Sequence, residues 1–334
     1  MNSPKVSIIV PVYNVEKYIE RCAVSLFEQT YSNIEYVFVN DCSIDQSIDV
    51  LNQVIGRYPN RAGHSRIINH QVNRGVAAAR NTALDRCTGE FVCQIDPDDY
   101  IELDAVESLL CQQEQSGSDI VTGQMVLHRS DRDELLDFPK YPNKRDMVID
   151  MMQPTIMHSL ANRLIRRSLF EEHEIRAKEG VNCGEDCWMM TRLAYFAKSC
   201  DTIDKVVYHY DRTRENSYTS SKNDVINKNK IKDDIATSKL IIDFFEDKEQ
   251  VFYDEANAVA LKYLNNVLFS CARLKDKPYY YEVLSQMKSF DKKYWGIINW
   301  DRSYWRSMTQ NFHSCRLLSS MMRLYGQMIS IVKI

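Results

Sequence analysis

Short apolar runs alternate with amphipathic segments through the first 125 residues, and this alternation constrains the fold more than any other feature. The apolar runs predict buried strands at Val6–Val10, Ile34–Val39, Arg66–Asn69, Phe91–Ile95 and Ile120–Val121. The segments between them have helical spacing and predict helices at Val15–Gln29, Ile44–Tyr58, Val76–Arg86 and Asp104–Gln113. Such alternation with short connections predicts an α/β fold: a Rossmann-like, mostly parallel sheet with helices on both faces.

The remainder of the chain follows other patterns. Residues 130–147 are highly charged, contain two prolines and predict a loop. Residues 150–220 are mixed, with an apolar run at Val206–Tyr210, and residues 225–334 predict helices such as Asn257–Leu274 without any strand. We therefore expect an α/β domain over residues 1–220 and a helical C-terminal region over residues 221–334.

The charge of the chain is small but unevenly placed. A net charge of −4 over 334 residues argues against a nucleic-acid partner. The last 34 residues nevertheless carry five basic side chains against Asp301, and their apolar residues follow one helical stripe from Phe312 to Val332. A basic amphipathic helix with nearby aromatic residues suits contact with an anionic membrane surface through residues 312–334. The same stripe suits a helix packed on its own domain or a homodimer contact.

The cysteines indicate a reducing compartment. Ten cysteines are scattered without a C-x-x-C pair, which disfavours a zinc site and predicts reduced thiols. The N-terminal segment does not resemble a signal peptide, and no run of 18 apolar residues occurs. We expect a cytoplasmic protein, peripheral on the inner face of the membrane if its tail binds lipid.

Acidic residues follow the predicted strands. Asp41 follows the second strand, Asp96, Asp98 and Asp99 follow the fourth, and the pair Glu185–Asp186 comes later. Such oxygen ligands suit Mg²⁺ or Mn²⁺ with phosphate oxygens completing the shell. Alternatively, a single Asp can cap the next helix, and Glu185–Asp186 can complement a helix dipole. No Gly-rich phosphate loop is present, so a dehydrogenase or P-loop enzyme is not supported.

Five segments, in order, resemble family 2 glycosyltransferases with the GT-A fold. They are Val6–Tyr18, Ser25–Tyr31, Asn40–Asp45, Asn73–Asn81 and Asp96–Asp99. Looser matches occur at Ala161–Arg167, Gly184–Asp186 and Tyr208–Arg212. The resemblance implies a metal-dependent, inverting glycosyltransferase of the hexosyltransferase type that uses Mn²⁺ or Mg²⁺. Its donor would be a nucleotide sugar, expected to be a UDP-sugar, and its acceptor a glycan or lipid-linked hydroxyl in cell-surface polysaccharide assembly.

The resemblance also implies roles for individual residues. The donor-binding residues would be Pro11, Tyr13, Glu16, Asp41, Arg80 and Asp96. Asp98 would bind the cation, with His209 as a second metal neighbour, although a histidine in an apolar run is also a common core residue. Asp186 would be the general base, with Glu185 as the alternative.

Two positions depart from the family pattern. Cys42 stands where the family commonly has Gly, which makes a turn with positive φ less expected there. Ala161 replaces an aromatic residue, which puts stacking on the acceptor in doubt. The competing functions are a sugar nucleotidyltransferase, which normally opens with a Gly-rich loop after its first strand, and a nucleotide-sugar-binding scaffold without catalysis.

Overall fold

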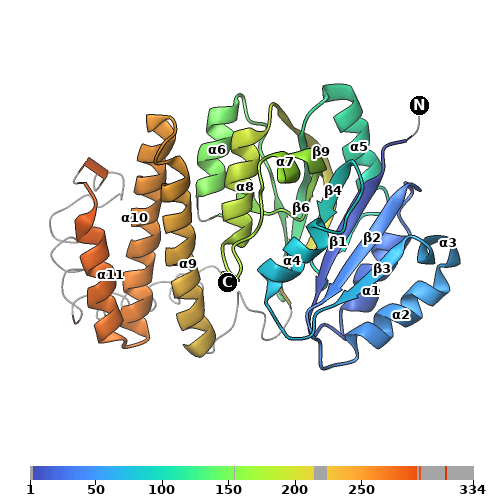
Figure 1. Ribbon diagram of the computed structural model, residues 1–334, viewed down its shortest axis with the longest axis horizontal. Helices are drawn as coiled ribbons and strands as arrows, with labels where there is room; N and C mark the ends of the chain where they lie inside the picture. Colours follow the sequence, from blue (N-terminus) through green and yellow to red (C-terminus); the bar gives the residue numbers. More distant parts are fainter. Residues whose placement is uncertain (1–2, 154, 214–223, 292, 295–312, 314–334) are drawn as a thin grey trace. The chain divides into compact units, whose positions relative to one another are not determined.

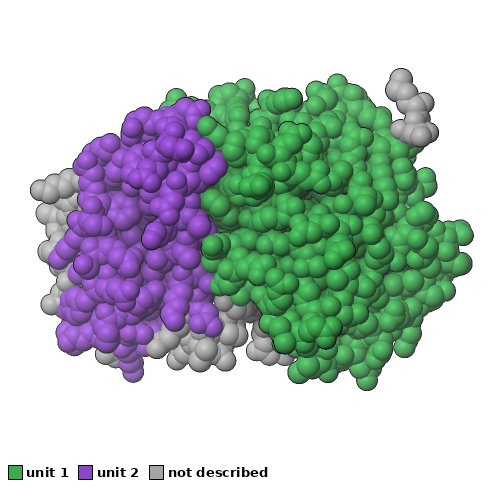
Figure 2. Space-filling view, in the orientation of Figure 1, with its two compact units in different colours: residues 1–221 green, residues 222–334 purple. Residues whose placement is uncertain are grey.

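The computed structural model describes residues 3–153, 155–213, 224–291, 293, 294 and 313. The chain divides into two compact units, residues 1–221 and 222–334 (Figure 2). This boundary lies one residue beyond the expected one. Apart from His313, the tail 312–334 lies outside the described residues. Among the described residues, no helix is long and apolar enough to cross a membrane.

A nine-stranded sheet forms the centre of the first unit (Figure 1). Its strands are β1 (Val6–Val12), β2 (Ile34–Asn40), β3 (Ser65–Asn69), β4 (Phe91–Gln94), β5 (Tyr100–Ile101), β6 (Ile120–His128), β7 (Asp133–Leu136), β8 (Arg163–Arg166) and β9 (Cys200–Asp211). Eight lie in the order β3-β2-β1-β4-β8-β6-β9-β5, and β7 pairs with β6.

The first half of the sheet is the predicted parallel block. β1 pairs in parallel with β2 and β4, and β2 pairs in parallel with β3. Val12 aligns with Asn40, and Asn40 aligns with Asn69, so these three strands end level with one another. Residues that follow β1 and β2 therefore emerge together at the carboxyl edge, where ligands of such sheets bind.

The second half of the sheet is mixed. β8 is antiparallel to both β4 and β6, β5 is antiparallel to β9, and β6 is parallel to β9. The predicted strand Ile120–Val121 is only the start of the longer β6. The α/β fold with a parallel block is confirmed, and the antiparallel β8 enters between the two parallel parts.

Helices cover both faces of this sheet. α1 (Ile19–Phe27), α2 (Ser47–Arg57) and α5 (Ala105–Ser116) share one apolar core with Ile8 and Val10 of β1. Because side chains alternate along a strand, Ile9 points to the other face, where α4 (Val76–Leu84) packs on β1 and β2. The unit is completed by α3 (Pro59–Ala62), α6 (Lys144–Met152), the 3₁₀ turn η1 (Ile156–His158), α7 (Arg167–Glu172) and α8 (Glu185–Phe196).

The prediction of a loop over residues 130–147 is wrong. This segment holds β7, and α6 begins at Lys144 with the Asn143 side chain accepting from the Asp146 backbone N–H. β7 pairs only at the rim of the sheet, and such edge strands carry charges without an apolar period. The strand β7 could therefore not be predicted from this charge-rich segment, because its sequence has no apolar alternation.

The described part of the second unit is helical, as predicted. It contains α9 (Asp224–Phe245), α10 (Gln250–Arg273) and α11 (Lys277–Ser289), with α10 in contact with both other helices (Figure 1). Its core gathers Leu264 and Leu268 of α10 with Tyr280 and Val283 of α11.

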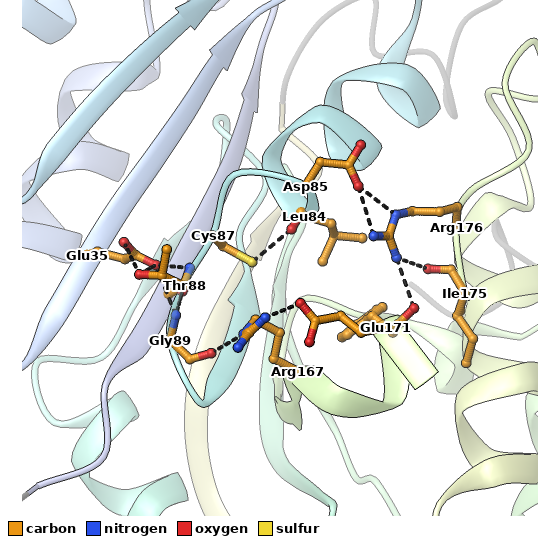
Figure 3. A network of polar contacts seen from close by, with 12 residues as sticks. Glu35, Leu84, Asp85, Cys87, Thr88, Gly89, Arg167, Glu171, Ile175 and Arg176 are labelled. Atoms are coloured by element: carbon orange, nitrogen blue, oxygen red, sulfur yellow. Dashed lines mark hydrogen bonds and ion pairs between the residues drawn. The ribbon is translucent and has the colours of Figure 1, made fainter. Parts of the chain in front are cut away.

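A buried glutamate ties the amino ends of the strands together. Glu35 of β2 accepts a hydrogen bond from the Ser7 hydroxyl at 2.6 Å and from the Thr88 hydroxyl at 3.0 Å. Its other oxygen pairs with Arg66 at 2.7 Å and Lys5 at 3.1 Å. Figure 3 shows Glu35 and Thr88 near Arg167, which forms an ion pair with Glu171 on α7. Burial alone would raise the pKa of Glu35, but hydrogen bonds from Ser7, Thr88 and Lys5 lower it to about 2.

Candidate active site

The end of β2 places Asp41 in a buried turn. Only 2% of Asp41 is exposed. One carboxylate oxygen accepts from the Arg74 backbone N–H at 2.9 Å and lies 2.7 Å from His70 Nδ1. The other accepts from the Gly75 backbone N–H at 2.7 Å. Asp41 thus links the loop before α4 to the edge of the sheet. Its Oδ1 already accepts from two donors, whereas Oδ2 accepts from one and can accept one more.

Gly75 is required at this turn for two reasons. Its φ is +88°, a backbone conformation that side chains rarely adopt. A Cβ atom at this position would also collide with the Asn182 side chain. The sequence Asn73-Arg74-Gly75 therefore brings the start of α4 close to the loop that leads into α8.

The loop after β4 holds three aspartates in different environments. Asp99 is buried, accepts from the Tyr208 hydroxyl at 2.5 Å and accepts from the Asp211 backbone N–H at 2.8 Å. Burial, followed by the charges of Asp98 and Asp96, raises the pKa of Asp99 well above its usual range. Asp99 therefore anchors the loop to β9, while Asp96 and Asp98 are only partly buried.

Arg80 is the centre of the site. It projects from α4, is 3% exposed, and contacts three carboxylates. Its guanidinium lies 2.9 Å from Asp96 and 2.6 Å from Asp186, and it also contacts Glu185. One buried cation thus joins the loop after β4 to the first turn of α8. The carboxylates raise the pKa of Arg80 although burial alone would lower it, so the guanidinium stays charged.

Asp186 combines a raised pKa with partial exposure of its side chain. Burial raises its pKa to about 7, with the charges of Glu185 and Asp96 adding to the shift and Arg80 opposing it. Its side chain is still 22% exposed, so it can meet a ligand. A base with a pKa near the working pH is well placed for proton transfer.

These groups line one cavity of about 220 Å³ within the first unit. Its polar wall contains Arg80, Asp96, Glu185 and Asp186. The remaining wall comes from the loops before β8 and α8 and from β6 and β9: Met125, His158, Ser159, Ala161, Asn182, Cys183, Gly184, Tyr208 and Tyr210, with Asp99 behind them. The small Ala161, which replaces an aromatic residue of the family pattern, is part of this lining.

His209 does not join this group. It stacks on Tyr100, with 4.4 Å between ring centroids, and its ring nitrogens lie 2.7 Å from Glu102 and 3.0 Å from His128. Its neighbours Tyr208 and Tyr210 line the cavity instead, because successive side chains of a strand point to opposite faces. The sequence therefore predicts the apolar strand that contains His209, but Tyr208 and Tyr210 of this strand face the cavity and His209 faces away from it.

The remaining donor-side residues lie at the ends of β1 and β2. Pro11 is buried within β1, and Tyr13, just beyond its end, is 44% exposed. The Glu16 carboxylate accepts from the Gln46 backbone N–H at 3.0 Å, which links the two loops. None of these three residues is among those that line the cavity around Arg80.

The structure corrects the expectation for Cys42. This residue has φ = +63° despite carrying a side chain. Asn14, in the facing loop, also has positive φ, and its side chain accepts from the Ile44 backbone N–H at 3.0 Å. The turn geometry is thus kept without the glycine, because the surrounding hydrogen bonds impose it.

The donor set is compatible with a divalent cation that arrives with a diphosphate. Among the described residues, no three His, Cys, Asp or Glu side chains are grouped to hold an ion by themselves. Mg²⁺ and Mn²⁺ sites in nucleotide enzymes commonly need only one or two carboxylates plus phosphate oxygens. Asp98, partly exposed beside Asp96, can supply that ligand.

Sequence comparison agrees with this geometry. Residues 7–174 match the family described as Glycosyl transferase family 2. The uncharacterized glycosyltransferase EpsJ of Bacillus subtilis is 33% identical over 224 residues, 65% of this chain and 63% of EpsJ. The minor teichoic acid biosynthesis protein GgaB of the same species is 27% identical over 249 residues, 73% of this chain and 27% of GgaB. The match spans less than two thirds of either relative.

Structure comparison shows the same fold. The crystal structure of S. aureus TarS residues 1–349 in complex with UDP-GlcNAc superposes with a TM-score of 0.54 at 20% identity. The superposition covers 81% of this chain and 82% of the TarS chain. The family match over half of the sequence establishes that the chain belongs to glycosyl transferase family 2.

Proposed function

We propose that this protein transfers a sugar from a UDP-sugar to a hydroxyl of a glycan or lipid-linked acceptor in cell-surface polymer assembly. The observation that carries the proposal is the cavity in which Asp186, with a pKa raised to about 7, shares one buried guanidinium with Asp96 and Glu185. The similarity to the minor teichoic acid biosynthesis protein GgaB supports the polymer class, and the UDP-GlcNAc complex of TarS supports the donor class.

Asp186 is the proposed base. An acceptor hydroxyl is a weak nucleophile, and its proton must leave as the new glycosidic bond forms. The partly exposed Asp186 carboxylate can take that proton, while Arg80 and the Leu160 backbone N–H hold it in place. Attack opposite the departing diphosphate in one displacement inverts the anomeric carbon. Glu185 contacts the same guanidinium but is more deeply buried, so it serves to orient Arg80.

The donor diphosphate is proposed to lie at the loop after β4. A bound Mn²⁺ or Mg²⁺ would supply positive charge where negative charge develops on the leaving diphosphate. Asp98 would hold it from the protein side, without His209, which lies against Glu102 and His128. The nucleoside would extend toward the ends of β1 and β2, where Asp41 and the exposed Tyr13 lie.

The direct test is release of UDP from a panel of UDP-sugars with Mn²⁺, with EDTA-treated protein as the control. Turnover with one UDP-sugar, lost with EDTA and in Asp186→Asn, is the expected result. Asp98→Asn should weaken Mn²⁺-dependent UDP binding measured by calorimetry. Production of pyrophosphate from UTP and a sugar 1-phosphate would instead identify a nucleotidyltransferase. Binding of UDP-sugars without any turnover would identify a scaffold.

A further inference from the structure

His158 lines the reaction cavity, but the mechanism above does not use it. It ends η1 and faces the same space as Asp186 and Tyr210. Two residues later, the Leu160 backbone N–H donates to the Asp186 carboxylate. The segment that carries His158 is therefore fastened to the base itself, and the imidazole is held beside the reacting groups.

The hydrogen bond of one ring nitrogen fixes the tautomer. His158 Nδ1 lies 3.1 Å from the Gln153 carbonyl oxygen. A carbonyl can only accept, so Nδ1 carries the proton and Nε2 of the neutral ring is an acceptor. Burial lowers the pKa of His158 to about 4, which keeps the ring neutral near pH 7. Nε2 has no hydrogen-bond partner among the described residues.

The size and polarity of the cavity indicate what Nε2 meets. At about 220 Å³ the cavity is smaller than the roughly 300–1,000 Å³ of pockets that bury a drug-sized molecule. It suits one sugar ring, whose hydroxyls can donate to a bare nitrogen and whose faces can rest on Tyr208 or Tyr210.

We propose that Nε2 of His158 accepts a hydrogen bond from a carbohydrate hydroxyl in this cavity and thereby selects the sugar. The inference rests on the proposed function and adds a specificity-determining residue to it. A site that offers an acceptor to a hydroxyl discriminates against a sugar that lacks it, because the acceptor is then left unpaired. The hydroxyl can belong to the transferred sugar or to the acceptor sugar.

The test compares His158→Leu, which removes the acceptor, with His158→Gln, which restores one. His64→Leu, at an exposed histidine, is the matched control. The assays are UDP binding, hydrolysis of the preferred UDP-sugar without an acceptor, and transfer to a panel of octyl β-glycosides. We expect His158→Leu to lose about tenfold in kcat/KM with unchanged UDP affinity, and His158→Gln to recover most of it. A loss already seen in hydrolysis assigns the hydroxyl to the donor sugar, and a loss confined to transfer assigns it to the acceptor.

If the wild type turns over a UDP-sugar and His158→Leu has the same kcat/KM as the wild type, this inference is refuted while the proposed function stands. No turnover of any UDP-sugar by the wild type would overturn the proposed function and this inference with it. If His158→Leu does not fold, NMR of the wild-type ring replaces it. The Nε2 resonance should then move when UDP-sugar and octyl glycoside are added but not with UDP, and an unmoved resonance in a protein that turns over would refute the proposal.

Discussion

The two edges of the sheet differ in their ratio of buried acids to their partners: one edge has several donors for one carboxylate, and the other has three carboxylates for one guanidinium. At the amino edge, the single carboxylate of Glu35 accepts hydrogen bonds from Ser7 and Thr88 and forms ion pairs with Arg66 and Lys5. At the carboxyl edge, the single guanidinium of Arg80 faces three carboxylates. The first arrangement lowers the pKa of Glu35 to about 2, and the second leaves that of Asp186 at about 7.

The difference suggests that the carboxylate at the amino edge stabilises the fold, whereas the carboxylates at the carboxyl edge are available for a reaction. An acid with a surplus of donors remains ionised and stabilises the fold at neutral pH. Acids that outnumber their cation retain an affinity for a proton or a further cation. The carboxylates at the carboxyl edge can therefore bind a proton or a cation during a reaction, whereas the charge of Glu35 at the amino edge is already balanced by its partners.

The largest expected effect is on catalysis at the carboxyl edge. Asp186→Asn should lower sugar transfer by roughly 10²–10⁴-fold, because the amide cannot accept the proton of the hydroxyl. Donor binding measured by calorimetry should be retained, since Arg80 keeps Asp96 and Glu185. Glu185→Gln is the comparison variant and should lose less. A larger loss in Glu185→Gln than in Asp186→Asn would reverse the assignment of the base.

The next effect is on stability at the amino edge. Glu35→Gln should reduce the free energy of unfolding by about 2–3 kcal/mol at pH 7, because the pKa of Glu35 falls from 4.5 to about 2 on folding. A lowered folded-state pKa stabilises above the unfolded value and loses that stabilisation as the pH falls toward 2. The gap between variant and wild type in urea titrations should therefore shrink below about pH 4.5.

Glu20→Gln provides the matched control for Glu35→Gln. Glu20 pairs with Arg57 at 2.8 Å, but its side chain is 59% exposed. Such surface pairs contribute roughly 0–1 kcal/mol. Equal losses in the two variants would contradict the contrast between a buried, multiply donated carboxylate and a solvated one.

A smaller effect follows from the pKa of Asp186. Because burial raises this pKa to about 7, the carboxyl is protonated below that pH and cannot act as a base. The value of kcat/KM, which reports the free enzyme, should fall about tenfold for each pH unit below 7. The residual activity of Asp186→Asn should lack this limb. An inflection near pH 4 in the wild type would mean that Asp186 is not held as the structure shows.

The sequence predicts the parallel block because its strands β1, β2 and β4 are buried on both faces and are therefore largely apolar. It does not predict β8, where Arg163 and Arg166 flank Leu164 and Ile165, since a central strand with two arginines has no apolar run. Arg163 is buried and donates to the Met157 carbonyl at 2.6 Å. That contact depends on tertiary structure and leaves no local pattern.

The sequence predicts which acidic residues belong to the candidate site better than it predicts which contacts they make. Motif position identified Asp96, Asp186 and Arg80 as site residues, and they converge. Donor binding by Arg80 stays a prediction. Its ion pairs with Glu185 and Asp186 could not be predicted, because they depend on the packing of α8 against the start of α4. His158 lies outside every motif used, and nothing in the sequence around it marks the bond to Gln153 that fixes its tautomer.

The smallest effect concerns Cys42, where the carboxyl edge holds backbone strain. Positive φ costs a residue with a Cβ roughly 1–2 kcal/mol, and glycine adopts it without that cost but with greater entropy in the unfolded chain. Cys42→Gly should therefore raise the free energy of unfolding by about 0.5–1 kcal/mol. Cys42→Ala keeps the Cβ while removing the same thiol, so it should leave stability unchanged. If both variants gain equally, the thiol rather than the turn is the source of the cost, and the carboxyl edge stores no strain at this position.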